Sequence, residues 1–294
     1  MTVRPLIGAW SFAPWLPWPY KAIDYAGLLP HVVAGTEFER ADLGGVSVQR
    51  ITPAHVQPGR TILYFHGGAF IVGGWYLHRG LLSHIAAATG AQILAVDYRQ
   101  LPHSPISASV QDCAATYAAL SGELPASEIV LMGDSAGGYL VFSTLAYAAT
   151  EGLPMPAAAV AYSPLPGWRD LDDTRGFSGC AVFGPHAIPT MARYATKRET
   201  MPDHLTPKDA IGAELPPILI EAAARESLYS DIEDLAADLL AAGADVELRS
   251  WDLDVHVFQA SVAWVPESRD AVAFAADFCA RAWVAAARTR DRVG

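Results

Sequence analysis

The chain predicts an α/β fold in which a mostly parallel sheet is covered by helices on both faces. From Thr61 onward, short apolar runs rich in β-branched residues alternate with longer helical patterns, which is typical of a parallel sheet. Hydrophobic residues make up 52% and charged residues 17% of the 294 positions, enough apolar side chains for one large core. A Gly-x-Ser-x-Gly sequence at 133–137 lies between a predicted strand and a predicted helix. We therefore expect residues 1–294 to form a single domain.

The first 34 residues are apolar and rich in aromatic side chains, among them Trp10, Trp15 and Trp18. Prolines interrupt the apolar runs here, so neither a signal sequence nor a membrane span is predicted. We interpret the segment as an arm that packs on the body, with contact to a lipid interface as the alternative. Residues 36–51 then alternate around Gly44 and Gly45, which predicts a β-hairpin.

The remaining regular elements follow from the length and period of each apolar run. Strands are predicted at 61–65, 92–96, 128–132, 157–162, 217–222 and 246–251. Helices are predicted at 79–89, 108–120, 138–150, 231–242 and 270–287. Gly90 closes the first of these helices, and Ser230 with Glu233 forms a capping box at the start of the fourth.

Residues 163–214 interrupt the alternation of strands and helices. They form a long connection rich in Pro and Gly, with Trp168, Phe177, Phe183 and Tyr194 among its aromatic side chains. A connection this long in a compact domain is usually functional. We interpret residues 165–214 as a lid and expect them, together with the arm at 1–34, to line a substrate pocket as cap elements.

Charge and cysteine usage exclude several classes of protein. The net charge is −11 and no cluster of Lys and Arg reverses it, which argues against a nucleic-acid partner. The three cysteines, Cys113, Cys180 and Cys279, are far apart, so no disulfide framework is expected, and this favours a reducing compartment. Metal-ligand spacing is absent, and no metal or cofactor is expected. The prediction is a cytoplasmic protein.

The stretch 133–137 reads Gly-Asp-Ser-Ala-Gly and has the context of a nucleophile elbow, a strand followed at once by a sharp turn and a helix. The backbone at such a serine is strained, so only residues without bulk fit beside it. The turn would expose the Ser135 hydroxyl and direct the helix N-terminus toward a developing oxyanion. Ser135 is therefore the candidate nucleophile.

An activated serine needs a base, and the base needs an acid that orients it. His256 follows the last predicted strand and is the candidate base, whereas His186 and His204 fall in the long connection and are given surface or capping roles. Glu226, just beyond a strand, is the candidate acid. Asp231 is explained by the predicted capping box, because a carboxylate is favoured in a first helical turn. The alternatives that stay open are Asp231, Glu221, Asp252 and Asp254.

Donors for the oxyanion are predicted in the His-Gly-Gly sequence at 66–68, which directly follows the strand at 61–65. Paired glycines leave backbone N–H groups unobstructed and allow a substrate oxygen to approach closely. Gly67, Gly68 and Ala136 form the predicted oxyanion hole. We expect His66 to fix the loop rather than to transfer protons.

Together these motifs resemble the hormone-sensitive-lipase-like family (bacterial family IV) of the α/β-hydrolase fold. The resemblance rests on His-Gly-Gly-Ala-Phe at 66–70, Asp-Tyr-Arg at 97–99, Gly-Asp-Ser-Ala-Gly-Gly at 133–138 and His-Val-Phe at 256–258. It implies a carboxylesterase that cleaves short- and medium-chain acyl esters through a Ser-Glu-His triad, under a cap formed by the N-terminal segment and the insertion. The chain departs from the family at 226–228, where Glu-Ser-Leu replaces Asp-Pro-Leu, and at 100–103, where Gln-Leu-Pro-His replaces Leu-Ala-Pro-Glu.

Two other interpretations stay open. An amidase or formamidase would use the same triad, since the motifs do not distinguish C–O from C–N cleavage. Some relatives of the fold, such as gibberellin receptors, only bind a ligand, but they typically lose the triad histidine that is present here as His256. The expected partner is a small-molecule ester, and the oligomeric state, including a homodimer, is left open.

Overall fold

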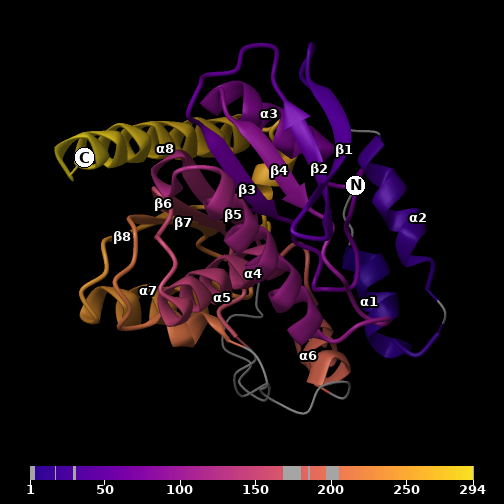
Figure 1. The fold of residues 1–294 in the computed structure, drawn as a ribbon. Helices are drawn as coiled ribbons and strands as arrows, with labels where there is room; N and C mark the ends of the chain where they lie inside the picture. Colours follow the sequence, from indigo (N-terminus) through magenta and orange to yellow (C-terminus); the bar gives the residue numbers. More distant parts are fainter. Residues whose placement is uncertain are drawn as a thin grey trace.

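A computed structural model gives the structure of residues 4–16, 18–28, 31–167, 180–184, 186–196 and 205–293. In these residues eight strands form one sheet in the order β1-β2-β4-β3-β5-β6-β7-β8 (Figure 1). They are β1 (Glu37–Leu43), β2 (Val46–Thr52), β3 (Thr61–Phe65), β4 (Gln92–Val96), β5 (Ile129–Asp134), β6 (Ala158–Tyr162), β7 (Ile218–Ala223) and β8 (Val246–Trp251). Strand β2 pairs antiparallel with β1 and β4, and all other neighbours are parallel. The predicted hairpin and the mostly parallel sheet are confirmed.

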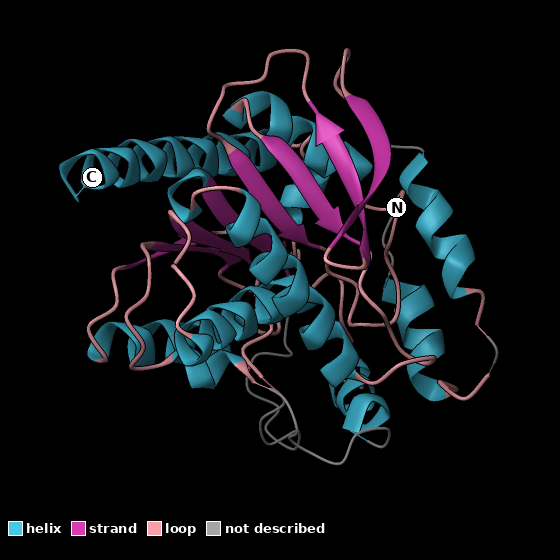
Figure 2. Cartoon of the chain, in the orientation of Figure 1, coloured by secondary structure: helices cyan, strands magenta, loops and turns pink. Residues whose placement is uncertain are grey.

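Helices cover both faces of the sheet (Figure 2). The main ones are α3 (Arg79–Thr89), α4 (Ile106–Glu123), α5 (Ala136–Glu151), α7 (Tyr229–Ala241) and α8 (Pro266–Val293). In β3, Ile62 and Tyr64 belong to an apolar cluster with α3 and α8, whereas Leu63 and Phe65 pack with α4, α5 and α7. Because side chains alternate along a strand, one buried strand supplies both layers of the core.

The start of α7 differs from the sequence prediction. Leu228 is the N-cap residue, so Ser230 already lies inside the first helical turn and its hydroxyl is not at the capping position. The predicted capping box of Ser230 and Glu233 is therefore wrong. The reason is packing: Leu228, Ile232 and Leu235 form a buried stripe at helical spacing, and this stripe sets where the helix begins.

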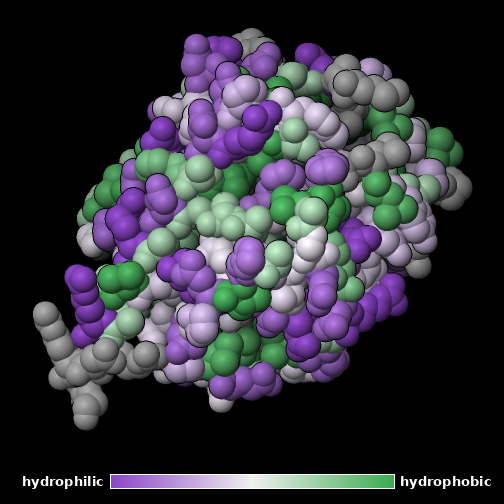
Figure 3. Space-filling model, turned by 90° about the horizontal axis from the view of Figure 1, so that it is seen from above, coloured by the Kyte–Doolittle hydropathy of each residue, from purple (hydrophilic) through white to green (hydrophobic). Residues whose placement is uncertain are grey.

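Two segments outside the sheet lie side by side. They are the arm, with α1 (Arg4–Phe12), α2 (Tyr20–Asp24) and η1 (Tyr25–Leu28), and the long connection with α6 (Ala187–Thr196) (Figure 1). The ring of Trp10 meets the ring of Tyr194 edge-on with centroids 5.6 Å apart, and Arg4 donates to the carbonyl oxygen of Cys180 at 3.1 Å. Hydrophilic and hydrophobic side chains are mixed over the face drawn in Figure 3. None of the helices within the described ranges is long and apolar enough to cross a bilayer.

Candidate active site

Ser135 occupies the turn between β5 and α5 with φ 51° and ψ −114°, a backbone conformation that non-glycine residues seldom adopt. The turn is pressed against the end of β3. A Cβ atom added at Gly137 would lie 1.8 Å from the carbonyl oxygen of Phe65, and one at Gly133 would lie 2.5 Å from that of Gly137. The glycines of the elbow are therefore required by close backbone approach, as the sequence predicted.

His256 lies between Ser135 and Glu226. Its Nε2 is 2.8 Å from Ser135 Oγ, and its Nδ1 is 3.3 Å from Glu226 Oε2. The side chains of His256 and Glu226 are buried, and the ring of Phe183 packs against the imidazole with centroids 4.9 Å apart. Since Nδ1 faces a carboxylate, it carries the hydrogen, and Nε2 is left to accept a proton from the serine hydroxyl.

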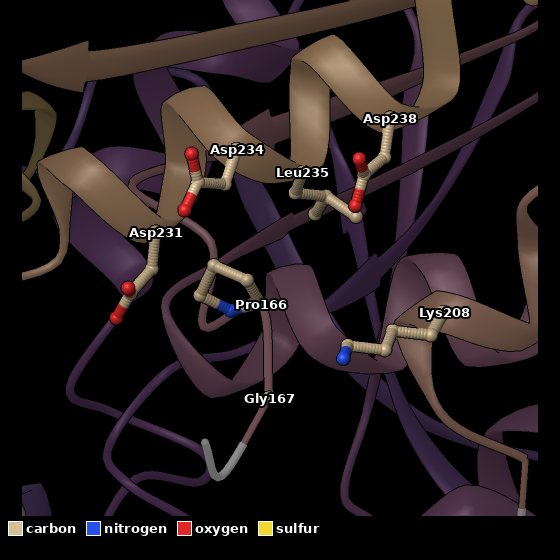
Figure 4. Close-up of a pocket in the computed structure, with 7 residues that line it drawn as sticks. All are labelled: Pro166, Gly167, Lys208, Asp231, Asp234, Leu235 and Asp238. Carbon is tan, nitrogen blue, oxygen red and sulfur yellow. The ribbon is translucent and has the colours of Figure 1, made fainter. Parts of the chain in front are cut away.

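Three of the four alternative carboxylates lie elsewhere. Asp231 lines a small cavity between α7 and the loop that contains Gly167 (Figure 4). Lys208 lines the same cavity. Glu221, on β7, accepts a hydrogen bond from the indole of Trp251, and Asp252 pairs with an arginine side chain. In the described part of the chain, Glu226 is thus the carboxylate that contacts His256.

The other histidines and the cysteines singled out by sequence take no part in this contact or fall outside the described ranges. His186 is exposed and its ring lies 6.1 Å from that of Phe12. His204, Trp168 and Phe177 lie outside the described residues. All three cysteines are buried and free. No group of three His, Cys, Asp or Glu side chains in the residues that the structure describes could hold a metal ion.

The loop after β3 differs from the prediction at Gly67. Its N–H donates to Asp134 Oδ1 at 2.9 Å, so this donor is already engaged, and Gly67 is not among the residues that line the pocket over Ser135. The role expected for Gly67 in the oxyanion hole is therefore wrong. Gly68 and Ala69 line the pocket beside Ser135, and neither N–H has a protein partner among the described residues. An N–H group forms only one strong hydrogen bond at a time. The candidate oxyanion donors in this loop are therefore the N–H groups of Gly68 and Ala69, instead of those of Gly67 and Gly68.

Asp134 is a site residue that the sequence reasoning did not single out. Its buried carboxylate accepts hydrogen bonds from the Tyr64 hydroxyl at 2.7 Å, from the Gly67 N–H at 2.9 Å and from His78 Nε2 at 3.2 Å. Burial alone would raise the pKa of Asp134, but the charge and hydrogen bond of His78 outweigh it and lower that pKa. Burial would likewise lower the pKa of His78, yet Asp134 raises it. The signal in the sequence was a charged residue within the elbow at 133–137.

His66 has a structural role in the same network. Its Nδ1 donates to the carbonyl oxygen of Gly67 at 2.7 Å, and its ring stacks on that of Tyr98 with centroids 4.3 Å apart. The Tyr98 hydroxyl donates to the carbonyl oxygen of His66 at 2.7 Å. Burial, with a smaller effect of His78, lowers the pKa of His66 to about 4, so the imidazole is neutral. This agrees with a residue that fixes the loop.

A cavity of about 270 Å³ opens over the Ser135 hydroxyl. Its walls are almost entirely apolar. The arm contributes Leu6, Ile7, Trp10, Trp18, Tyr20 and Ile23, and the long connection contributes Val182, Phe183 and Met191. The prediction that both segments line a pocket is confirmed for the described residues. Such a cavity suits an apolar chain attached to a reacting carbonyl group.

A serine on an elbow, backed by a histidine and a carboxylate at the edge of a parallel sheet, defines an α/β-hydrolase. The family profile described as alpha/beta hydrolase fold matches residues 62–260. A solved structure, the hormone-sensitive-lipase homologue EstE7 from a metagenome library, superimposes with a TM-score of 0.83 at 29% identity and covers 96% of this chain and 99% of its own. The chain belongs to the hormone-sensitive-lipase-like esterases of the alpha/beta hydrolase family and is a carboxylic ester hydrolase.

Curated relatives carry names of the same kind. Esterase LipU of Mycobacterium tuberculosis is 33% identical over 283 residues, covering 91% of this chain and 95% of the relative. An acetyl-hydrolase of Streptomyces hygroscopicus is 35% identical over 244 residues, 80% of each chain. Carboxylesterase/phospholipase LipF of M. tuberculosis is 33% identical over 283 residues, covering 91% of this chain and 75% of the relative.

Proposed function

We propose that the protein hydrolyses short- to medium-chain acyl esters through an acyl-enzyme on Ser135. His256 takes the proton from Ser135 Oγ as the oxygen attacks the ester carbonyl, and gives it to the leaving alcohol. The same imidazole then activates the water that releases the acid. Glu226 accepts the hydrogen bond of Nδ1 and stabilises the imidazolium. The observation that carries the proposal is the 2.8 Å contact between His256 Nε2 and Ser135 Oγ.

The oxyanion is assigned to the N–H groups of Gly68, Ala69 and Ala136. The first two line the pocket, and the third opens α5 directly after Ser135, where helical N–H groups have no intrahelical acceptor. Donors fixed in advance at this point stabilise negative charge as it develops, and one such donor contributes about 10²–10³-fold to kcat in a comparable hydrolase.

The acyl chain is assigned to the apolar cavity under the cap formed by 1–34 and 165–214. A panel of 4-nitrophenyl esters from acetate to palmitate, with the matched anilides, tests substrate class and chain length together. We expect kcat/KM to be highest for short and medium chains and to fall for palmitate, because the cavity is small. Faster cleavage of the anilides would favour an amidase, and no turnover of either series would favour a ligand-binding protein.

We also assign contact with a lipid interface to the outer side of the arm. Phe12 and Trp15 are 72% and 76% exposed, although their segment lines the substrate pocket on its inner side. Apolar side chains exposed beside a pocket for acyl chains suit the surface of a lipid aggregate. The double variant Phe12→Ser/Trp15→Ser should sediment less with phosphatidylcholine vesicles and keep its activity on a soluble ester. Trp264→Ser, which changes another exposed tryptophan, is the matched control. Equal sedimentation of the wild type, the double variant and Trp264→Ser would contradict the assignment.

A further inference from the structure

Ser163 is a buried serine to which the proposed reaction gives no role. It directly follows β6, is fully buried, and has φ 44°, in the left-handed region. Residues other than glycine adopt this conformation rarely, and they keep it only where surrounding contacts hold them there. The conformation of Ser163 must therefore be held by specific contacts.

The hydroxyl of Ser163 joins the candidate acid to the turn that carries the candidate base. Its Oγ donates to Glu226 Oε2 at 2.8 Å and accepts the N–H of Val257 at 3.2 Å. Val257 directly follows His256 and has φ 52°, a conformation in which a β-branched residue is strained. One buried hydroxyl thus contacts the carboxylate on one side and the strained turn after the imidazole on the other.

Few hydrogen bonds orient the carboxylate of Glu226. Oε2 accepts from Ser163 and from His256, at 2.8 and 3.3 Å, while Oε1 is buried without a hydrogen-bond partner in the described part of the chain. A hydrogen bond to an ionised oxygen is stronger than one between neutral groups and fixes its direction more firmly. Ser163 therefore supplies the closer of the two contacts that orient the acid.

We propose that Ser163 is a positioning residue. Its hydroxyl fixes the Glu226 carboxylate relative to the turn at 256–257, so that Nδ1 of His256 faces the carboxylate. The inference rests on the proposed function, because Ser163 acts only through Glu226 and His256. Ser163 is not among the residues that line the pocket. Its hydroxyl therefore contributes to kcat and leaves KM unchanged.

Two substitutions at Ser163 distinguish the effect of losing the hydroxyl from the effect of the left-handed backbone conformation. Ser163→Ala removes the hydroxyl, and Ser163→Gly removes it while also relieving the left-handed conformation. Both should lower kcat for a 4-nitrophenyl ester by about 10- to 100-fold, the range for losing a hydrogen bond to a charged group, with KM within about twofold of the wild type. Ser143→Ala, which removes a buried hydroxyl inside α5, is the matched control and should keep the wild-type kcat.

Combining Ser163→Ala with Glu226→Ala tests whether the hydroxyl acts through the carboxylate. The double variant should be no slower than Glu226→Ala alone, because the contact is already absent. The proposal would be overturned if Ser163→Ala lowered kcat by the same factor in the wild type and in Glu226→Ala. It would also be overturned if Ser163→Ala and Ser163→Gly both kept the wild-type kcat, or if neither of them folded. Wild-type kcat in Glu226→Ala would instead overturn the proposed function, so the two failures are distinguishable.

Discussion

The N–H of Gly67 donates a hydrogen bond to Asp134 Oδ1 at 2.9 Å, and this bond joins the loop after β3 to the last residue of β5. The same carboxylate also accepts a hydrogen bond from the imidazole of His78. The bond from Gly67 therefore fixes the loop that carries the candidate oxyanion donors to the turn that carries Ser135.

Removing the Asp134 carboxylate should cost both stability and activity. In Asp134→Ala, the Gly67 N–H and His78 are buried without their acceptor, and breaking a buried ion pair in this way costs about 3–5 kcal/mol. Asp134→Asn keeps an acceptor oxygen for Gly67 and should retain more activity. Urea unfolding and kcat/KM of the two variants measure this, and an alanine variant as stable and active as the wild type would show that the bond is incidental.

The glycines of the elbow give a second prediction. Gly137→Ala places a methyl group 1.8 Å from the carbonyl oxygen of Phe65, so either the turn moves or the protein does not fold, and esterase activity is lost. Gly122→Ala is the matched control, since Gly122 lies in α4 with no atom within 4 Å of an added Cβ. This control should raise the free energy of unfolding by about 0.5–1 kcal/mol. Normal activity in Gly137→Ala would contradict the packing described for the elbow.

Glu221 should make stability depend on pH. Burial raises its pKa to about 8, whereas an unfolded glutamate titrates at about 4.3. Between these pH values the folded protein keeps a proton that the unfolded chain has lost. The free energy of unfolding therefore falls as pH rises, by up to about 1.4 kcal/mol per pH unit for this group.

Replacing Glu221 by glutamine should remove that contribution. The stability of Glu221→Gln relative to the wild type is expected to increase from about pH 5 to about pH 8, as measured by urea unfolding at each pH. Glu123→Gln, at an exposed position of α4, serves as the control and should follow the wild type. A constant difference between Glu221→Gln and the wild type across this range would contradict the raised pKa.

Much of this architecture could be predicted because its signals are local. The bounds of β3, β4 and β8 agree with the apolar runs, and the contact of Ser135 with His256 follows from the elbow and from a histidine placed after the last strand. Contacts across strands could not be found in this way. Whether the N–H of Gly67 faces a substrate or a carboxylate depends on Asp134, which lies 67 residues away in the chain. The start of α7 was mistaken because burial of Leu228 outweighs a local capping pattern.

The identity of the acid is tested by comparing Glu226→Gln with Asp231→Asn. Loss of the acid that orients a triad histidine lowers kcat by roughly 10⁴, so this loss is expected for Glu226→Gln. Asp231 lies in the first turn of α7, where removing a carboxylate should cost about 0.3–1 kcal/mol of stability and leave the chemistry unchanged. Steady-state kinetics with one good ester, alongside an unfolding curve, decides between them. The reverse pattern would give the role to Asp231.

The central claim is that Ser135 becomes acylated, and covalent labelling tests it most directly. The protein is treated with a fluorophosphonate, and the modified peptide is identified by mass spectrometry. The account predicts a single adduct on Ser135, no adduct in a folded Ser135→Ala variant, and a loss of kcat in that variant of about 10⁶-fold. Labelling of another serine, or turnover by Ser135→Ala at the wild-type rate, would contradict it.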